Sequence, residues 1–166
     1  MFDKVRSIFA HGVNIKHSLL KVAISCAENG YAVWFITPQE INSLPDNLPI
    51  PDTEVSKLLT FLYLKDYSDF LSILHGIHGW NKIPNIIIVN SLNVYVREDN
   101  NDFVSAAHII SNVISAGMVC AKKHKDNKAM VLMGCSNIDF YKKFIDLHCS
   151  EVFNADSNDL GLIVNG

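Results

Sequence analysis

The sequence predicts an α/β fold with a mainly parallel central sheet flanked by helices. Short apolar runs alternate along the chain with longer segments of helical periodicity, an order typical of strand–helix–strand crossovers. The runs at 31–37, 85–90 and 129–135 are almost entirely apolar, as expected for strands covered on both faces. With 166 residues, of which 49% are hydrophobic and 19% charged, we expect a single domain over 1–166 with one substantial core.

The first half of the chain contains the clearest helix signals. Apolar residues recur at helical spacing up to Asn29-Gly30, a pair that commonly ends a helix. Pro38 ends the strand that follows, and three prolines between 45 and 51 mark an irregular segment. Asp66 is suited to cap the next helix. The elements expected here are strands at 5–10, 31–37 and 58–64, and helices at 15–28 and 67–78.

The second half continues the alternation. Its run NIIIVN is the clearest buried strand in the sequence, and a long apolar helix separates it from the run AMVLMGC. A shorter helical segment and two closing apolar runs complete the chain. The elements expected here are strands at 85–90, 129–135, 152–153 and 160–164, and helices at 102 to about 122 and at 138–147.

Composition limits the possible functions. The net charge of −3 disfavours binding of nucleic acid through overall charge, so such binding needs a local basic patch. The four cysteines form no C-x-x-C pair, which favours a reducing compartment, the cytosol or the nucleus. The first ten residues lack the apolar centre of a signal peptide, and we expect no membrane-spanning helix and no membrane partner.

The loop at 10–18, between the first strand and the first helix, lies where α/β proteins place a phosphate-binding loop. Such a loop uses glycines to wrap a phosphate, a lysine to hold it, and a Ser or Thr to bind Mg²⁺. Gly12 and Lys16 are present, whereas Ile15 replaces the second glycine and His17 replaces the hydroxyl residue. Isoleucine resists the glycine conformation, and histidine is a poor ligand for Mg²⁺. The loop therefore predicts the place of a phosphate site without its magnesium chemistry.

The strand at 85–90 ends on a neutral residue, Asn90. An acid at the end of such a strand acts on the hydration shell of Mg²⁺ in nucleotide-hydrolysing enzymes. An amide can order a water molecule but contributes no charge, so metal binding is weakened. An ordinary strand end explains Asn90 equally well. No metal site is expected elsewhere, since His75 and His78, at helical spacing, have no third ligand nearby in the sequence.

A basic cluster follows the long helix and is a candidate for contact with a DNA backbone. It contains Lys122, Lys123, Lys125 and Lys128. The cluster concentrates positive charge in an otherwise acidic protein, which favours contact with phosphates. Stabilisation of the helix C-terminus by cations is the alternative explanation.

Four segments, taken in their order and spacing, give the chain a resemblance to a known family. It resembles the RecA-type recombinase paralogues, in particular the small subunits that pair with a SWIM zinc-finger protein in Shu-type complexes. The resemblance runs from about residue 8 to residue 164. The segments that carry it are SLLKVAISCAENGYAVWFITPQEINSLP at 18–45, YLKDYSDFLSILHGIH at 63–78, PNIIIVNSLNVYV at 84–96 and VLMGCSN at 131–137.

The resemblance implies a RecA-like three-layer fold with a degenerate nucleotide site. The phosphate-loop lysine of the family falls on Lys16, its hydroxyl residue on His17 and its Walker B acid on Asn90. The glutamate that activates water falls at or beside Gln39, with Glu40 next to it. We therefore expect a pseudo-ATPase rather than an enzyme, with no cofactor beyond weak binding of ATP through Lys16.

The resemblance also implies a role in homologous recombination repair in the nucleus. The expected partners are a SWIM-domain zinc-finger protein, a recombinase whose filament assembly the pair promotes, and single-stranded DNA bound by the complex. In this family the region of Lys142 and Lys143 lies near a loop that faces DNA, and Tyr141 beside them could stack on a base. A solvated helix face is the alternative explanation for these residues.

Two other functions remain open from the sequence. The chain could be a divergent ATPase that uses Lys16 with unusual magnesium ligands. It could also be a structural subunit of an Elongator-type assembly, whose RecA-like members lack Walker motifs and bind transfer RNA.

Overall fold

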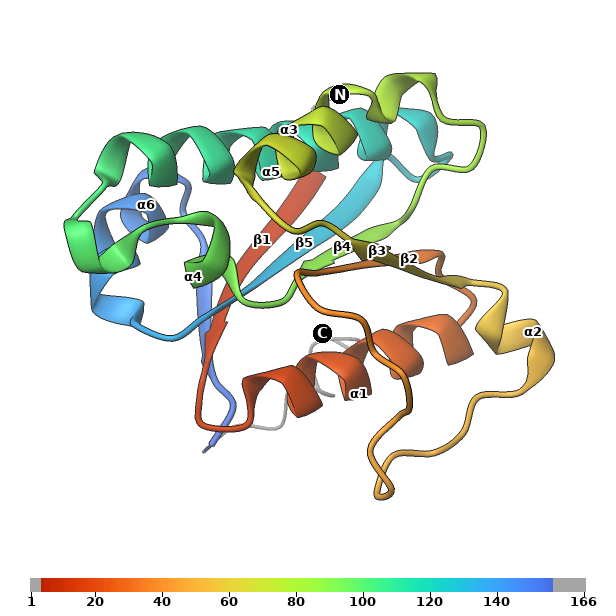
Figure 1. Cartoon of the computed structure of the whole chain (residues 1–166). Coiled ribbons are helices and arrows are strands. Elements are labelled where there is room, and N and C mark those ends of the chain that lie inside the picture. The colour runs from red at the N-terminus through yellow and green to blue at the C-terminus, as the bar shows by residue number, and fades with distance from the viewer. Residues whose placement is uncertain (1–3, 157–166) are drawn as a thin grey trace.

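A six-stranded, all-parallel sheet forms the centre of the molecule (Figure 1). The computed structural model describes residues 4–156. The strand order is β3-β2-β4-β5-β1-β6. The strands are β1 (Lys4–His11), β2 (Val33–Thr37), β3 (Leu59–Tyr63), β4 (Ile86–Val89), β5 (Lys128–Cys135) and β6 (Glu151–Asn154). The predicted α/β class is confirmed, and the strand expected at 160–164 lies outside the described residues.

Helices connect consecutive strands, as parallel pairing requires. They are α1 (Ile15–Glu28), α2 (Thr53–Ser56), α3 (Tyr67–His75), α4 (Leu92–Tyr95), α5 (Phe103–Lys123) and α6 (Lys142–Leu147). Three 3₁₀ turns are η1 (Ile77–Gly79), η2 (Glu98–Asn100) and η3 (Ile138–Tyr141). The side chain of Asp66 caps α3 as predicted, accepting a hydrogen bond of 2.9 Å from the amide of Asp69. The helix expected over 67–78 ends early, at His75, with Gly76 as its C-cap, and a 3₁₀ turn follows it.

The sheet is covered on both faces, which explains why its central strands are apolar throughout. Successive residues of β1, such as Ile8 and Phe9, enter two separate cores on opposite faces of the sheet, and both are fully buried. Helix α1 covers one face, and α3 and α5 cover the other (Figure 1). These three layers and the strand order are consistent with a RecA-like α/β fold.

Helix α5 is long and apolar enough to cross a membrane by length and composition alone. In the structure it packs along β5 and β1, and its residues Ile109, Ile110 and Val113 are fully buried in the core. A core helix passes the same test of length and composition. Packing against the sheet therefore accounts for the apolar residues on the buried face of α5.

Because all strands run in one direction, the sheet has two chemically different ends. We call the end where the strands finish the carboxyl edge, and the end where they begin the amino edge. The loop from β1 to α1, the segment after β2 and the end of β4 all lie at the carboxyl edge. In open parallel sheets ligands bind at this edge, where crossovers leave the sheet in opposite directions.

Candidate functional site

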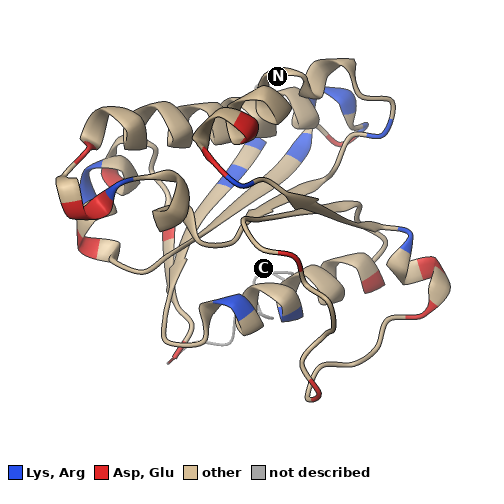
Figure 2. Cartoon of the chain, in the orientation of Figure 1, with Lys and Arg blue, Asp and Glu red and all other residues tan. Residues whose placement is uncertain are grey.

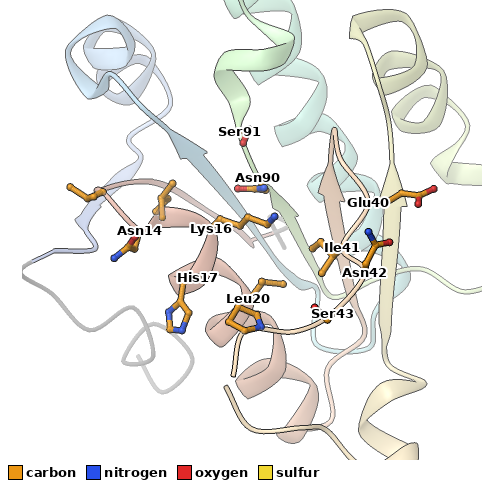
Figure 3. Close-up of a pocket in the computed structure, with 13 residues that line it drawn as sticks. Asn14, Lys16, His17, Leu20, Glu40, Ile41, Asn42, Ser43, Asn90 and Ser91 are labelled. Atoms are coloured by element: carbon orange, nitrogen blue, oxygen red, sulfur yellow. The ribbon is translucent and has the colours of Figure 1, made fainter. Parts of the chain in front are cut away.

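A cavity of about 540 Å³ opens at the carboxyl edge, at the place predicted for the phosphate site (Figure 3). Four parts of the chain line it: the loop after β1, the first turns of α1, the segment after β2 and the end of β4. The lining residues are Val13, Asn14, Ile15, Lys16, His17, Leu20, Glu40, Ile41, Asn42, Ser43, Pro45, Asn90 and Ser91. The structure thus brings Lys16, His17 and Asn90 together. Glu40 lines the cavity, whereas Gln39 does not.

The loop between β1 and α1 depends on a glycine. Gly12 has a φ of +150°, and a Cβ at this position would lie 3.0 Å from the Cβ of Ala155. Both the conformation and the close approach therefore require glycine. At Ile15, by contrast, the chain has already entered α1, so a branched side chain fits without strain. Gly12 thus shapes the turn from β1 into α1, but it does not itself line the cavity.

The chain after β6 clamps this loop from the side. The backbone amide of Val13 donates to both carboxylate oxygens of Asp156, at 3.0 and 3.3 Å. The amide of Ala155 donates to the carbonyl of His11 at 2.7 Å, which holds the clamp against the end of β1. A carboxylate therefore occupies a backbone donor of a loop that commonly binds phosphate. No local pattern in the sequence points to Asp156 as part of this site, because 143 positions separate it from Val13.

The mouth of the cavity is positively polarised by α1. The first backbone amides of a helix have no partner within the helix, and they carry part of its positive dipole. The first turn of α1 has no acidic residue, and the side chain of Asn14 does not cap it. Lys16 adds a full positive charge and extends toward Asn90 (Figure 3). This combination favours an anionic ligand.

Asn90 is the most buried polar residue of the cavity lining. It is only 3% exposed, and its Nδ2 donates to Thr37 Oγ1 at 3.2 Å. Its Oδ1 has no hydrogen-bond partner within the described residues. A buried acceptor without a partner costs about 1–3 kcal/mol. The site therefore favours a ligand or water that donates a hydrogen bond at this point.

Two other lining residues do not face this centre. Nε2 of His17 lies 2.9 Å from Oδ1 of Asn47, and its ring points away from Lys16 and Asn90 (Figure 3). His17 thus fastens α1 to the loop that precedes Leu48 instead of replacing a magnesium ligand. The carboxylate of Glu40 also points away from Lys16 and Asn90 in Figure 3. In this arrangement no carboxylate faces the amine of Lys16 across the cavity within the part of the chain that the structure describes.

Beneath the site, the end of β5 carries a thiol that is not available as a nucleophile. Cys135 is 1% exposed, and burial raises its pKa to about 12. Its Sγ donates weakly to the carbonyl of Ala10 at 3.7 Å. A thiol with this pKa stays protonated near neutral pH, and the thiolate is the reactive form. Cys135 therefore gives the cavity no reactive thiol.

The prediction that Tyr141 stacks on a base is wrong. Tyr141 is fully buried, and its hydroxyl donates to Oε1 of Glu98 at 2.7 Å. Burial raises the pKa of the Tyr141 hydroxyl well above its ordinary value, and this hydrogen bond raises it further by a smaller amount. The ring packs at 5.7 Å from that of Phe9. Its role is therefore to fill the core beside α6.

The basic residues proposed to contact DNA do not form one surface. Lys122, Lys123, Lys125 and Lys128 lie at the amino edge, where α5 ends and β5 begins. Lys142 and Lys143 follow the carboxyl end of β5, at the carboxyl edge of the sheet. Nζ of Lys142 pairs with Asp139 at 3.0 Å, and Nζ of Lys143 lies 5.1 Å from the centre of the Phe103 ring. The four lysines at the amino edge and the two at the carboxyl edge therefore belong to two separate surfaces.

The chain matches no protein-family model, and no curated protein matches it. Within residues 4–156, no three His, Cys, Asp or Glu side chains are placed to hold a metal ion together. Nε2 of His75 lies 2.8 Å from Oδ1 of Asn112, so this histidine has a neighbour on α5.

Proposed function

We propose that this protein is a non-catalytic RecA-type recombinase paralogue, a pseudo-ATPase that acts as a binding subunit. The observation that carries the proposal is the cavity at the carboxyl edge. It keeps the lysine and the helix N-terminus of a phosphate site, but its most buried polar residue is the neutral Asn90. The consistency of the strand order with a RecA-like fold supports the same assignment.

The cavity keeps groups that can bind an anion but lacks groups that turnover of ATP needs. Metal-assisted nucleophile generation and general base catalysis each contribute about 10²-fold or more to a rate. Asn90 supplies no charge to a magnesium shell, and the carboxylate of Glu40 is turned away from the centre of the cavity. Loss of both contributions leaves an anion site that binds ATP weakly and does not hydrolyse it at a useful rate.

The proposed partners are a SWIM-domain zinc-finger protein and, through the resulting heterodimer, single-stranded DNA and a recombinase in the nucleus. Exposed apolar side chains support a protein partner. Val94, Phe103 and Val104 are 50%, 39% and 82% exposed, and they belong to α4 and the start of α5. Apolar surface of this kind is typical of a site that another protein covers. The pair would promote assembly of the recombinase filament.

Co-expression with the SWIM-domain protein of the same organism tests the partner. We expect a stable complex in equal amounts after purification. Val104→Glu should weaken the complex, whereas Ile50→Glu is the matched control, because Ile50 is 89% exposed in the irregular segment after β2. Absence of a complex between two folded chains would refute the proposal, and recovery of RecA-like Elongator subunits from native extract would replace it.

ATP turnover tests the second part of the proposal. We expect no release of phosphate above background, together with a small thermal stabilisation by ATP that Lys16→Ala removes. A divergent ATPase is the alternative, and the presence of Glu40 in the cavity lining favours testing it. Turnover by the natural chain that disappears in Lys16→Ala would show that the protein is an enzyme.

A further inference from the structure

The amino edge of the sheet collects positive charge. Six exposed lysines lie there, although the whole chain carries a net charge of −3. Lysine and arginine positions gather around the end of α5 and the beginnings of β1 and β5 in Figure 2. We call this group the amino-edge basic surface. Its members are Lys4, Lys82, Lys122, Lys123, Lys125 and Lys128.

Hydrogen bonds join the parts of this surface into one unit. The Nζ of Lys123 donates to the carbonyl of His78, which connects the end of α5 to η1. A ring nitrogen of His124 lies 3.0 Å from the carbonyl of Pro84. His78 and Pro84 flank Lys82 in the sequence, so both ends of the segment that carries Lys82 are held to the end of α5. The amide of Lys4 donates to the carbonyl of Asn127 at 3.0 Å, which places β1 beside the turn before β5. The lysines are thus held on a shared scaffold.

The pairing of two of these lysines is unfavourable on its own. Lys4 and Lys128 are direct partners in the parallel register of β1 and β5. Like charges directly opposite each other on neighbouring strands destabilise a sheet. The Oδ1 of Asp126, two residues before Lys128, accepts from the backbone amide of Lys128 at 3.1 Å. A bound polyanion would relieve the repulsion between the two amines.

An aromatic hollow borders the same surface. A cavity of about 610 Å³ is lined by Trp34, Thr60, Gly79, Trp80, Asn81 and Lys82. Trp80 packs edge to face with Trp34, their ring centres 4.7 Å apart, and Trp80 remains 38% exposed. Lysines next to an accessible aromatic ring form the combination that binds single-stranded nucleic acid, with phosphates on the cations and bases stacked on the ring.

We propose that the amino-edge basic surface binds single-stranded nucleic acid, with one base held in the Trp80 hollow and the phosphates on the lysines. The proposal deepens the proposed function, which gives single-stranded DNA to the complex, but it concerns residues of this chain alone. It also places the contact on the edge opposite Lys142 and Lys143. An acidic protein segment fits the lysines equally well but leaves the aromatic hollow without a role.

Binding of a fluorescent oligothymidylate to the purified full chain tests the surface. We expect the double variant Lys125→Glu and Lys128→Glu to lower the affinity at least tenfold. In the same variant, the slope of log affinity against log salt should fall by about 0.7 for each lost phosphate contact. The double variant Lys142→Glu and Lys143→Glu is the matched control, with the same change of charge at the other edge, and it should change the affinity less than threefold.

The aromatic hollow has its own test. Lys82→Glu changes an exposed side chain at its rim and should weaken binding without loss of folding, measured by thermal unfolding. Single strands should quench tryptophan fluorescence and bind at least tenfold more tightly than a duplex or a polyglutamate of the same charge. Equal binding of duplex or polyglutamate would overturn the proposal, as would equal losses in the two double variants. These measurements use the isolated chain. Loss of nucleic-acid binding is therefore distinguishable from failure to form the complex with the SWIM-domain protein, because either can occur without the other.

Discussion

The clamp of Asp156 on the loop after β1 predicts that the chain restrains its own anion site. Asp156→Ala removes the two contacts, of 3.0 and 3.3 Å, that its carboxylate makes with the amide of Val13. A hydrogen bond to a charged group contributes about 1.5–3 kcal/mol in a protected place, and this one is exposed, so about 1 kcal/mol is expected. For a chain of this size, that loss lowers the midpoint of thermal unfolding by about 2–4 °C.

The same substitution should strengthen anion binding. It frees a backbone donor of the loop and removes a negative charge next to the site, and about 1 kcal/mol of relieved repulsion corresponds to roughly a fivefold gain in affinity. Calorimetric titration with pyrophosphate, without magnesium, measures this gain directly. Asp146→Ala removes an exposed acid on α6 and is the control for overall charge. A folded Asp156→Ala protein with unchanged pyrophosphate affinity would show that the clamp and the anion site are independent.

Two further predictions concern the scaffold around the site. Glu98→Ala leaves the buried hydroxyl of Tyr141 without its acceptor and should cost about 1–3 kcal/mol of unfolding free energy in urea, whereas Tyr141→Phe should cost about 1 kcal/mol. Additive losses in the double variant would contradict this coupling. The hydrogen bond from Arg6 lowers the pKa of the Glu151 carboxyl from its ordinary 4.5, so their contribution to stability is present above pH 4.5 and is lost as pH falls through the lower folded value. Acid titration of unfolding should show a shallower decline in Glu151→Gln, by less than about 1 kcal/mol because both side chains are partly exposed.

Local pattern was sufficient to predict the long elements. Helix α1 has the predicted bounds, and β4 and β5 match their apolar runs within one residue at each end, because both faces of these strands are covered. Short elements escaped prediction. Helix α4 begins after Ser91, which adopts a left-handed conformation with a φ of 64°. A serine gives no local signal for that conformation, so the contact of α4 with the rest of the fold has to decide it.

The location of the candidate site could be predicted from the sequence, whereas the roles of several of its residues could not. Chain order alone puts Lys16 and Asn90 at the same edge, because parallel strands finish together. The choice between Gln39 and Glu40 needed the path of the segment after β2, which has no regular structure. Burial of Tyr141 could have been predicted, because Phe140, Tyr141 and Phe144 follow helical spacing and indicate an inward face.

The distribution of charge between the two edges argues that the lysines at the amino edge are more than helix caps. In a parallel α/β fold the helix C-termini point to the amino edge, so cations there stabilise the helix dipoles. That effect acts within the last helical turn, and in the amino-edge basic surface it accounts for Lys122 and Lys123, which lie in the last turn of α5. Lys4 and Lys128 instead begin strands and face each other in register. Lys82 lies in the turn before β4, beside an exposed tryptophan. Helix stabilisation therefore explains only two of the six lysines. Binding of a single-stranded nucleic acid would use the lysines for its phosphates and the exposed tryptophan for a base.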